Sequence, residues 1–210
     1  MRVQKYILHL IIFLPFLIPR KVIAQQFPDS CLGGIDCSEM KRMADSLIRA
    51  GADTVMTSFT YVDGWPKYMD SVGTYSVDYI FWSKNQKAYG RKIISSDHFP
   101  SKSYNCTISY DVFIFFTSNY DYINREVILP YSIKVTRNGF VGYEPISGTH
   151  TEYTVIRAYA KEKILDTYIS PRDLRDNIIS NKSPENVNLE FNLNTKLYQL
   201  YKMLKNIMTE

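Results

Sequence analysis

The sequence has little of what catalytic sites commonly use. It contains 3 His and 3 Cys among 210 residues, and it lacks a Gly-x-Ser-x-Gly elbow, a phosphate-binding Gly-rich loop and a His-Glu-x-x-His motif. Cys106 with His98 or His150 is the one nucleophilic pair left to consider. Two histidines and a cysteine arise in a chain of this size without such a role, so we expect neither a catalytic nucleophile nor a cofactor.

The N-terminus has the pattern of a secretory signal peptide over residues 1–24. A positive start precedes an apolar stretch at 6–18, and Val22-Ile23-Ala24 fits a cleavage site before Gln25. The alternative is a membrane anchor, but thirteen helical residues rise only about 20 Å, less than a hydrocarbon core of about 30 Å. No Cys follows the predicted cut directly, which argues against a lipid anchor. We therefore expect a periplasmic or secreted protein without stable membrane insertion once the signal is removed.

The positive charge of the chain belongs to this segment. The formal net charge is +4, from 25 basic and 21 acidic residues. Arg2, Lys5, Arg20 and Lys21 lie in the predicted signal, which holds no acid, so 21 basic and 21 acidic residues remain. A neutral chain without a basic run lacks the electrostatic pattern of a nucleic-acid binder. Residues 25–210 show no linker or repeat and are predicted to form a single domain.

Two of the three cysteines lie close together. Cys31 and Cys37 bracket a loop with two adjacent glycines, and in an oxidising compartment we predict a disulfide between them. The alternatives are two unpaired surface thiols or, with less support from spacing, a metal pair. Cys106 is left over and is predicted to enter an apolar strand as a buried, inert thiol.

Apolar periodicity in the first half predicts a helix followed by strands. A helical stripe over 38–50 ends at Gly51, and residues 54–62 alternate as a strand. Residues 74–82 and 88–94 form a predicted hairpin, whose first strand has apolar groups on both faces and so lies centrally in a sheet. The run 110–116 is continuously apolar and aromatic, and is interpreted as a further strand.

The second half predicts a hairpin, two strands and two helices. Residues 131–136 alternate, with Tyr131, Ile133 and Val135 facing inward, and Asn138-Gly139 supplies a type I′ turn leading into Val141 and Tyr143. Strands are predicted at 152–159 and 164–168. A short helix begins after Ser170 with Pro171 in its first turn, and a stripe of Leu193, Leu197, Leu200, Leu204 and Ile207 marks a C-terminal helix.

These elements predict the fold class α+β. We expect an antiparallel sheet of about five to seven strands with an N-terminal and a C-terminal helix packed on it, the helices lying to one side of the sheet.

Aromatic residues are the compositional excess, at 14 % with 17 Tyr and 2 Trp. Trp65, Tyr68, Trp82 and Tyr89 are candidates for a face that stacks on a glycan or contacts a protein. The alternative is that they are core residues or cross-strand pairs of the sheet. Trp65 is the strongest candidate because it lies in a Gly/Pro loop.

Four acids flank the central strands and could form a paired-carboxylate site. They are Asp63, Asp70, Asp78 and Asp97. The alternative is that they are solvated charges, as acidic residues usually are.

Three segments together resemble small uncharacterised exported proteins of Bacteroidota. They are Tyr79-Ile-Phe-Trp-Ser-Lys-Asn-Gln-Lys-Ala-Tyr89, Val112–Phe116 and Asn194-Thr-Lys-Leu-Tyr-Gln-Leu-Tyr-Lys202. The similarity spans most of the chain after the predicted signal. It implies export in a Gram-negative cell and an α+β sheet domain, and it implies no activity and no functional residues.

The sequence favours a non-enzymatic exported domain that binds a macromolecule of the cell envelope, protein first and glycan second. The first alternative is a cell-wall or glycan hydrolase that uses acids such as Asp63 and Asp97. The second is a periplasmic inhibitor or immunity protein.

Overall fold

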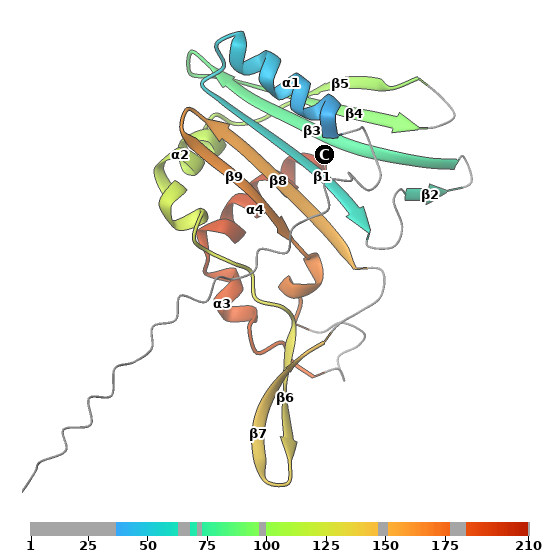
Figure 1. The fold of residues 1–210 in the computed structure, drawn as a ribbon, viewed down its shortest axis with the longest axis vertical. Helices are drawn as coiled ribbons and strands as arrows, with labels where there is room; N and C mark the ends of the chain where they lie inside the picture. Colours follow the sequence, from blue (N-terminus) through green and yellow to red (C-terminus); the bar gives the residue numbers. More distant parts are fainter. Residues whose placement is uncertain are drawn as a thin grey trace, which may run out of the picture.

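The computed structural model describes residues 37–62, 68–70, 73–96, 100–146, 151–176 and 184–209, which form the expected α+β fold (Figure 1). The strands are β1 (Thr54–Val62), β2 (Tyr68–Asp70), β3 (Gly73–Lys84), β4 (Lys87–Ser96), β5 (Lys102–Cys106), β6 (Ser132–Arg137), β7 (Phe140–Pro145), β8 (Glu152–Ala160) and β9 (Lys163–Ile169). The helices are α1 (Cys37–Arg49), α2 (Asp111–Ile123), the 3-10 turn η1 (Pro171–Leu174), α3 (Leu189–Leu193) and α4 (Lys196–Met208).

The main sheet has the strand order β5-β4-β3-β1-β8-β9, with neighbours antiparallel, and β2 pairs with the start of β3. The predicted hairpin β3–β4 is confirmed, and its turn residues Asn85 and Gln86 have φ values of 51° and 60°, as a type I′ turn requires. β3 lies inside the sheet, as its two apolar faces predicted. β1 and β8 are far apart in sequence yet adjacent, with Val55 opposite Tyr159.

One face of the sheet is covered in part by α1. Met40 and Ala44 of the helix pack against Val55, Ile80 and Ile93 of the sheet. The predicted helix is confirmed within one residue at each end, and it stops before Gly51, whose φ of +84° is the left-handed value that favours glycine.

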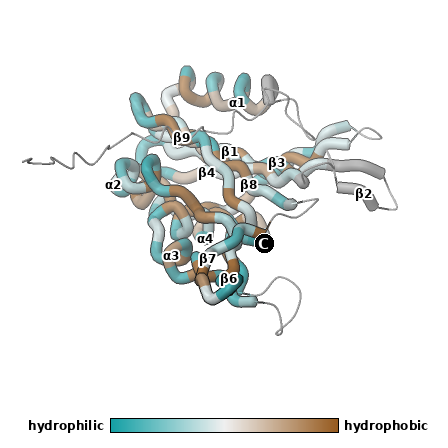
Figure 2. Tube along the Cα trace, turned by 60° about the horizontal axis from the view of Figure 1, so that its bottom comes forward, coloured by the Kyte–Doolittle hydropathy of each residue, from teal (hydrophilic) through white to brown (hydrophobic). Residues whose placement is uncertain are grey.

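The opposite face carries the larger core, under α2 and α4. Figure 2 shows α1 on one side of the sheet and these helices on the other. The fully buried side chains of this core come from the sheet (Met56, Phe81, Ile156, Ile169), from α2 (Phe113, Phe116, Ile123) and from α4 (Leu197, Leu200, Leu204). Each such side chain contributes about 1.5–3 kcal/mol when it leaves water.

The expectation that the helices lie to one side of the sheet is therefore wrong. Adjacent residues on the inner strands are both buried, as at Val55 with Met56 and Ile80 with Phe81. Because neighbouring residues of a strand point to opposite faces, each pair requires cover on both sides.

The predicted strand at 110–116, and with it the resemblance segment Val112–Phe116, is in fact the beginning of helix α2. A short apolar run fits a buried helix as well as a strand, since periodicity alone does not separate them. The buried residues of α2 are Val112, Phe113, Phe116 and Ile123, which lie on one helical face. Ile114, which a buried strand would enclose, is 48 % exposed.

The C-terminal helix is confirmed as α4. Its first turn is capped by Thr195, whose hydroxyl oxygen accepts a hydrogen bond from the Tyr198 amide at 3.0 Å. Leu193, the first member of the predicted stripe, belongs to the separate short helix α3. The turn after Ser170 is also confirmed, with the Ser170 hydroxyl accepting from the Arg172 amide at 3.3 Å.

The hairpin β6–β7 forms around Asn138 and Gly139 as predicted, with φ values of 51° and 80°. It is a separate two-stranded sheet that projects away from the main sheet (Figure 1). The predicted alternation holds in part. Tyr131 is buried ahead of β6, and Ile133 and Val135 are half-buried between the exposed Lys134 and Thr136, but Ser132, predicted to face outward, is buried.

Candidate functional site

Two of the four predicted aromatic residues, Trp82 and Tyr89, have side chains that the structure describes. Trp82 and Tyr89 are opposite each other on β3 and β4, and their rings stack with centroids 5.4 Å apart and planes inclined by 13°. Tyr68 pairs with Tyr75, seven residues from Trp82 along β3, or about 23 Å at strand spacing. Trp65 lies outside the described residues. A binding role for these residues stays a prediction.

Of the stacked pair, Trp82 packs beside the α1 cluster and is half-buried, whereas Tyr89 is 40 % exposed. The arrangement is that of a cross-strand pair, which stabilises the β3–β4 hairpin. Its outer ring, Tyr89, remains accessible to a partner.

Of the four predicted carboxylates, Asp78 alone has a side chain within the part that the structure describes. Asp63 and Asp97 lie outside the described residues, and Asp70 is in β2. Asp78 of β3 is 3 % exposed and accepts a hydrogen bond from the Ser76 hydroxyl at 3.2 Å. Asp78 is therefore a buried side chain of the sheet.

Of the three cysteines, Cys106 has a side chain within the part that the structure describes. Cys106 ends β5 as a free, half-buried thiol. Burial raises the pKa of this thiol above its ordinary value, and the positive charge of Lys92 offsets the rise only in part. A raised pKa lowers the thiolate fraction, which fits the predicted inert thiol. His98, His150, Cys31 and the Cys37 side chain lie outside the described residues, so the disulfide stays a prediction.

The residues the structure describes contain no group of three or more His, Cys, Asp or Glu that could hold a metal ion. In the same part of the chain no helix has both the length and the apolar character needed to cross a membrane.

A cluster of aromatic rings on the α1 side of the sheet was not predicted from the sequence. Tyr153 of β8 stacks on Tyr61 of β1 with centroids 5.3 Å apart, and Tyr168 of β9 meets Tyr153 edge-on at 5.5 Å. The three strands supply alternate residues of the same face, but their adjacency becomes visible only in the fold. The rings are half-buried and in contact with one another.

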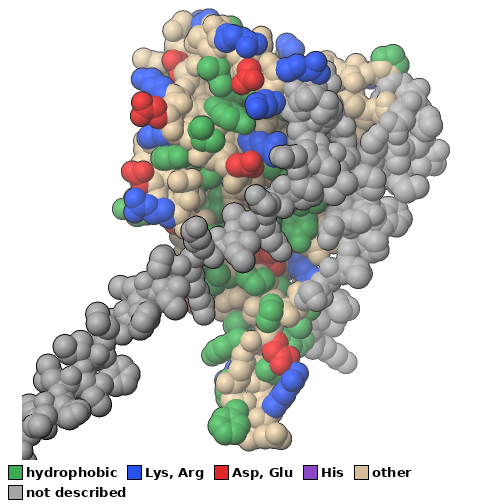
Figure 3. Space-filling view, in the orientation of Figure 1, with side chains coloured by type: hydrophobic (Ala, Val, Ile, Leu, Met, Phe, Trp, Pro, Cys, Tyr) green, Lys and Arg blue, Asp and Glu red, His purple; other side chains and the backbone are tan. Residues whose placement is uncertain are grey.

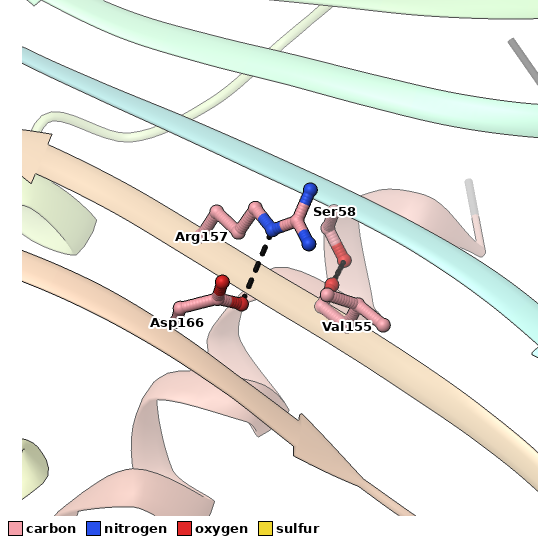
Figure 4. Close-up of polar contacts among 4 residues, drawn as sticks. All are labelled: Ser58, Val155, Arg157 and Asp166. Carbon is pink, nitrogen blue, oxygen red and sulfur yellow. Dashed lines mark hydrogen bonds and ion pairs between the residues drawn. The ribbon is translucent and has the colours of Figure 1, made fainter. Parts of the chain in front are cut away.

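Next to these rings lies an ion pair. Arg157 Nε donates to Asp166 Oδ1 at 3.1 Å (Figure 4). The Arg157 guanidinium also lies over the Phe59 ring, 5.9 Å from the centroid. The Ser58 hydroxyl donates to the Val155 carbonyl at 3.1 Å, which ties β1 to β8 at the same place. The Arg157 charge is therefore paired with Asp166, and the tyrosine rings of this face contact one another.

The most exposed apolar side chains lie instead on the β6–β7 hairpin. Phe140 is 81 % exposed, Tyr143 65 % and Val141 55 %, and Figure 3 shows hydrophobic side chains on the surface of the projecting hairpin. By register, Phe140 lies on the face of Val135, while Val141 and Tyr143 lie on the opposite face. Both faces of the ribbon are therefore partly apolar.

Few interactions within the hairpin itself stabilise it. Arg137 pairs with Glu144 across the strands at 2.8 Å, but this pair is solvent-exposed and such pairs contribute at most about 1 kcal/mol. An isolated two-stranded hairpin is marginally stable in water. The hairpin therefore depends on its attachment to the domain to stay folded.

The attachment is a buried polar network, which we call the anchor network: Tyr131, Asp173, Asn186 and Asn192. Asp173 Oδ1 accepts from the Tyr131 amide at 2.7 Å, and Asn186 Oδ1 accepts from the Ser132 amide at 3.3 Å. The Tyr131 hydroxyl donates to the carbonyls of Asp176 and Pro184. The network holds the start of β6 with side-chain acceptors in place of a neighbouring strand.

Asn192 completes the network from α3. Its Nδ2 donates to the Leu129 and Asp173 carbonyls at 2.9 and 3.0 Å, and its Oδ1 accepts from the Leu129 amide at 2.8 Å. Asparagine in a sequence indicates turns and exposed positions, so composition gave no sign of this role.

We predict that the anchor network makes stability depend on pH through Asp173. Burial raises the pKa of this carboxyl above its ordinary value of 3.8, against the smaller opposing effects of the Tyr131 amide and Arg172. The folded state therefore holds the proton more tightly, and this contribution to stability is present below pH 3.8 and lost as pH rises through the folded-state pKa. Asp173→Asn should flatten this part of the profile, measured by urea unfolding across pH.

The matched control for this prediction is Asp121→Asn, which removes one exposed carboxylate from α2. Asparagine at 173 can still accept from the Tyr131 amide, so the fold should survive the substitution. A profile for Asp173→Asn that runs parallel to wild type would contradict the prediction.

Comparison of the chain with protein families, with curated proteins and with solved structures found no match.

Proposed function

We propose that this chain is an exported, non-enzymatic domain that binds a protein partner through the β6–β7 hairpin. The observation that carries the proposal is the projecting ribbon with Phe140, Val141 and Tyr143 at its surface. Large apolar side chains gathered on one element mark interaction sites more often than side chains scattered singly. The predicted signal peptide and the absence of a recognised catalytic motif support the same reading.

The strand edges of the hairpin favour a protein over a glycan. Among the described residues β6 and β7 form strand pairs only with each other. The amide and carbonyl of Ser132 at the start of β6 bond to Asn186 and Val187, and beyond that residue each strand presents an outer edge of main-chain donors and acceptors. A polypeptide can continue such a ladder as an added strand, with its side chains meeting those of the ribbon. A glycan offers no matching ladder.

The surface of the hairpin also has the residue types that contribute most to protein interfaces. Tyrosine and phenylalanine supply large contact areas, and a few such residues usually carry most of the binding energy. The anchor network fixes the base of the ribbon, so less ordering is needed on binding.

The proposal predicts that hairpin side chains control affinity without controlling stability. Phe140→Ser and Tyr143→Ser should each weaken partner binding by about tenfold or more, as removal of an interface anchor does. Their melting temperatures should stay near wild type because both side chains are mostly exposed. Calorimetry with the purified partner and thermal unfolding measure the two quantities.

The partner is found first by crosslinking in the native cell. A photo-crosslinking residue at position 140 of the full, C-terminally tagged chain is compared with one at 114, since Ile114 is an exposed apolar residue of α2 on another element. An adduct formed from 140 and not from 114 supports the proposal. Equal adducts from both positions, or an adduct with a second copy of this chain, would count against a separate protein partner at the hairpin.

A further inference from the structure

A second candidate site is a cleft of about 310 Å³ between the sheet and the last turns of α4. This volume is at the lower end of the range for small-molecule sites. The cleft lies on the face opposite α1, where β1, β3, β4 and β8 meet the helix end. Tyr79 joins its two walls, because its hydroxyl donates to the Met208 carbonyl at 2.8 Å.

Two lysines line opposite walls of the cleft. Lys92 of β4 holds its ammonium 5.7 Å from the centroid of the Tyr79 ring, and Lys205 of α4 holds its own 5.5 Å from that of Tyr201. Within the part of the chain that the structure describes, neither ammonium has a carboxylate in ion-pair range. An aromatic ring orients a cation without neutralising it, so both positive charges remain available to a ligand.

The other lining groups limit the charge of that ligand. Glu152 also lines the cleft, so its lining residues carry two positive charges and one negative charge. The cleft faces the C-terminal end of α4, where the helix dipole is negative. A singly charged anion suits this balance better than a phosphate dianion.

The remaining lining residues suit a hydroxylated ligand. Thr60 and Thr154 are opposite each other on β1 and β8, and both contribute to the lining. Their hydroxyls can donate or accept, Glu152 can accept, and the tyrosine rings offer apolar surface. A ring with a carboxylate, several hydroxyls and an apolar C–H face would match the lysines, the polar lining groups and the tyrosine rings respectively.

We propose that this cleft binds a carboxylated monosaccharide-sized ligand, an acidic sugar, with its carboxylate between Lys92 and Lys205. The site is separate from the hairpin, so it stands or falls independently of the proposed protein binding.

The test is titration of the full chain with glucuronate, followed by ligand-observed NMR and calorimetry. Glucose is the neutral control and glucose 6-phosphate the dianion. We expect saturable binding of glucuronate with a Kd of about 1 mM, at least tenfold tighter than that of glucose. Binding should weaken as salt increases, because the lysines are partly exposed.

Variants distinguish the cleft from general attraction to positive charge. Lys92→Gln and Lys205→Gln should each weaken glucuronate binding about fivefold or more, and Lys92→Arg should retain it. Lys202→Gln, an exposed lysine of α4 outside the lining, should bind like wild type. Thermal unfolding confirms that each variant is folded.

The following results would overturn the proposal: no glucuronate binding at tenfold the expected Kd, equal affinity for glucose, tighter binding of glucose 6-phosphate, or an equal loss in Lys202→Gln. A loss confined to the two lining lysines, restored by arginine, establishes the site.

Discussion

Replacing Asn192 by alanine is expected to lower the free energy of unfolding by about 3–4 kcal/mol. The side chain is 0 % exposed and makes three hydrogen bonds. Its removal leaves the amide and carbonyl of half-buried Leu129 without these partners, and an unpaired buried group costs about 1–3 kcal/mol. The Asp173 carbonyl keeps a second donor in Asn186 Nδ2 at 3.0 Å, so its loss is smaller.

Asn194 provides the matched control, two residues along the chain. It is exposed and makes one side-chain bond, from Nδ2 to the Glu190 carbonyl at 2.9 Å. Asn194→Ala should cost less than about 1 kcal/mol because water replaces that bond. Urea unfolding of both variants decides the matter, and similar losses in the two would mean that the anchor network does not stabilise the domain.

Replacing Gly90 by alanine is expected to destabilise the domain by about 2–3 kcal/mol, within the range of overpacking substitutions. A Cβ atom at this position of β4 would lie 2.7 Å from Cys106 Sγ, 2.9 Å from the Cys106 carbonyl oxygen and 3.1 Å from Phe81 Cδ1. One of these neighbours is main chain of the adjacent strand β5, so β5 itself must move.

Two further variants test whether close packing against β5 causes the loss of stability in Gly90→Ala. Gly142→Ala in β7 places its Cβ 3.8 Å from Val135 Cγ2, an ordinary contact, and should change stability by less than about 1 kcal/mol. Adding Cys106→Ala to Gly90→Ala removes the sulfur contact but leaves the carbonyl contact, so it should restore only part of the loss. Equal effects of the two glycine substitutions, by chemical denaturation, would show that close packing against β5 is not the cause.

Most individual elements could be predicted because their signals are local. The turn at Asn138-Gly139 needs positive φ at two successive residues, and Gly51 stops α1 for a similar reason. The stripe Leu197, Leu200 and Leu204 repeats with the helical period, and all three are buried. Such signals depend on residues within one or two turns of one another.

The strand predicted at 110–116 was wrong because the local pattern there fits a strand and a helix equally well. Phe113 and Phe116 are apolar in either interpretation, and the choice between strand and helix depends on what covers them. Here one face of α2 packs on the sheet and α4, while Ile114 stays exposed. A local hint was present in Ser109, whose hydroxyl accepts from the Asp111 amide at the start of the helix.

The candidate sites were harder to predict than the fold. Phe140, Val141 and Tyr143 are residue types that strands usually bury, and only the separation of β6–β7 from the main sheet exposes them. The cleft brings together Lys92 of β4 and Lys205 of α4, which are far apart in the sequence. A lysine in a sequence indicates a solvated charge, and its partner across a cleft is invisible without the topology.

By itself, therefore, the sequence determined the fold class, the type I′ turn at Asn138-Gly139 and most helices and strands, since backbone conformation and burial pattern follow from near neighbours. Only the tertiary structure decided the strand order, the helix at 111–123, the cover on both faces of the sheet and the exposure of the hairpin. It also decided the anchor network. The Asn192 side chain is buried because main-chain groups at Leu129, 63 residues away, satisfy it, and contacts across such distances in the chain are set by packing.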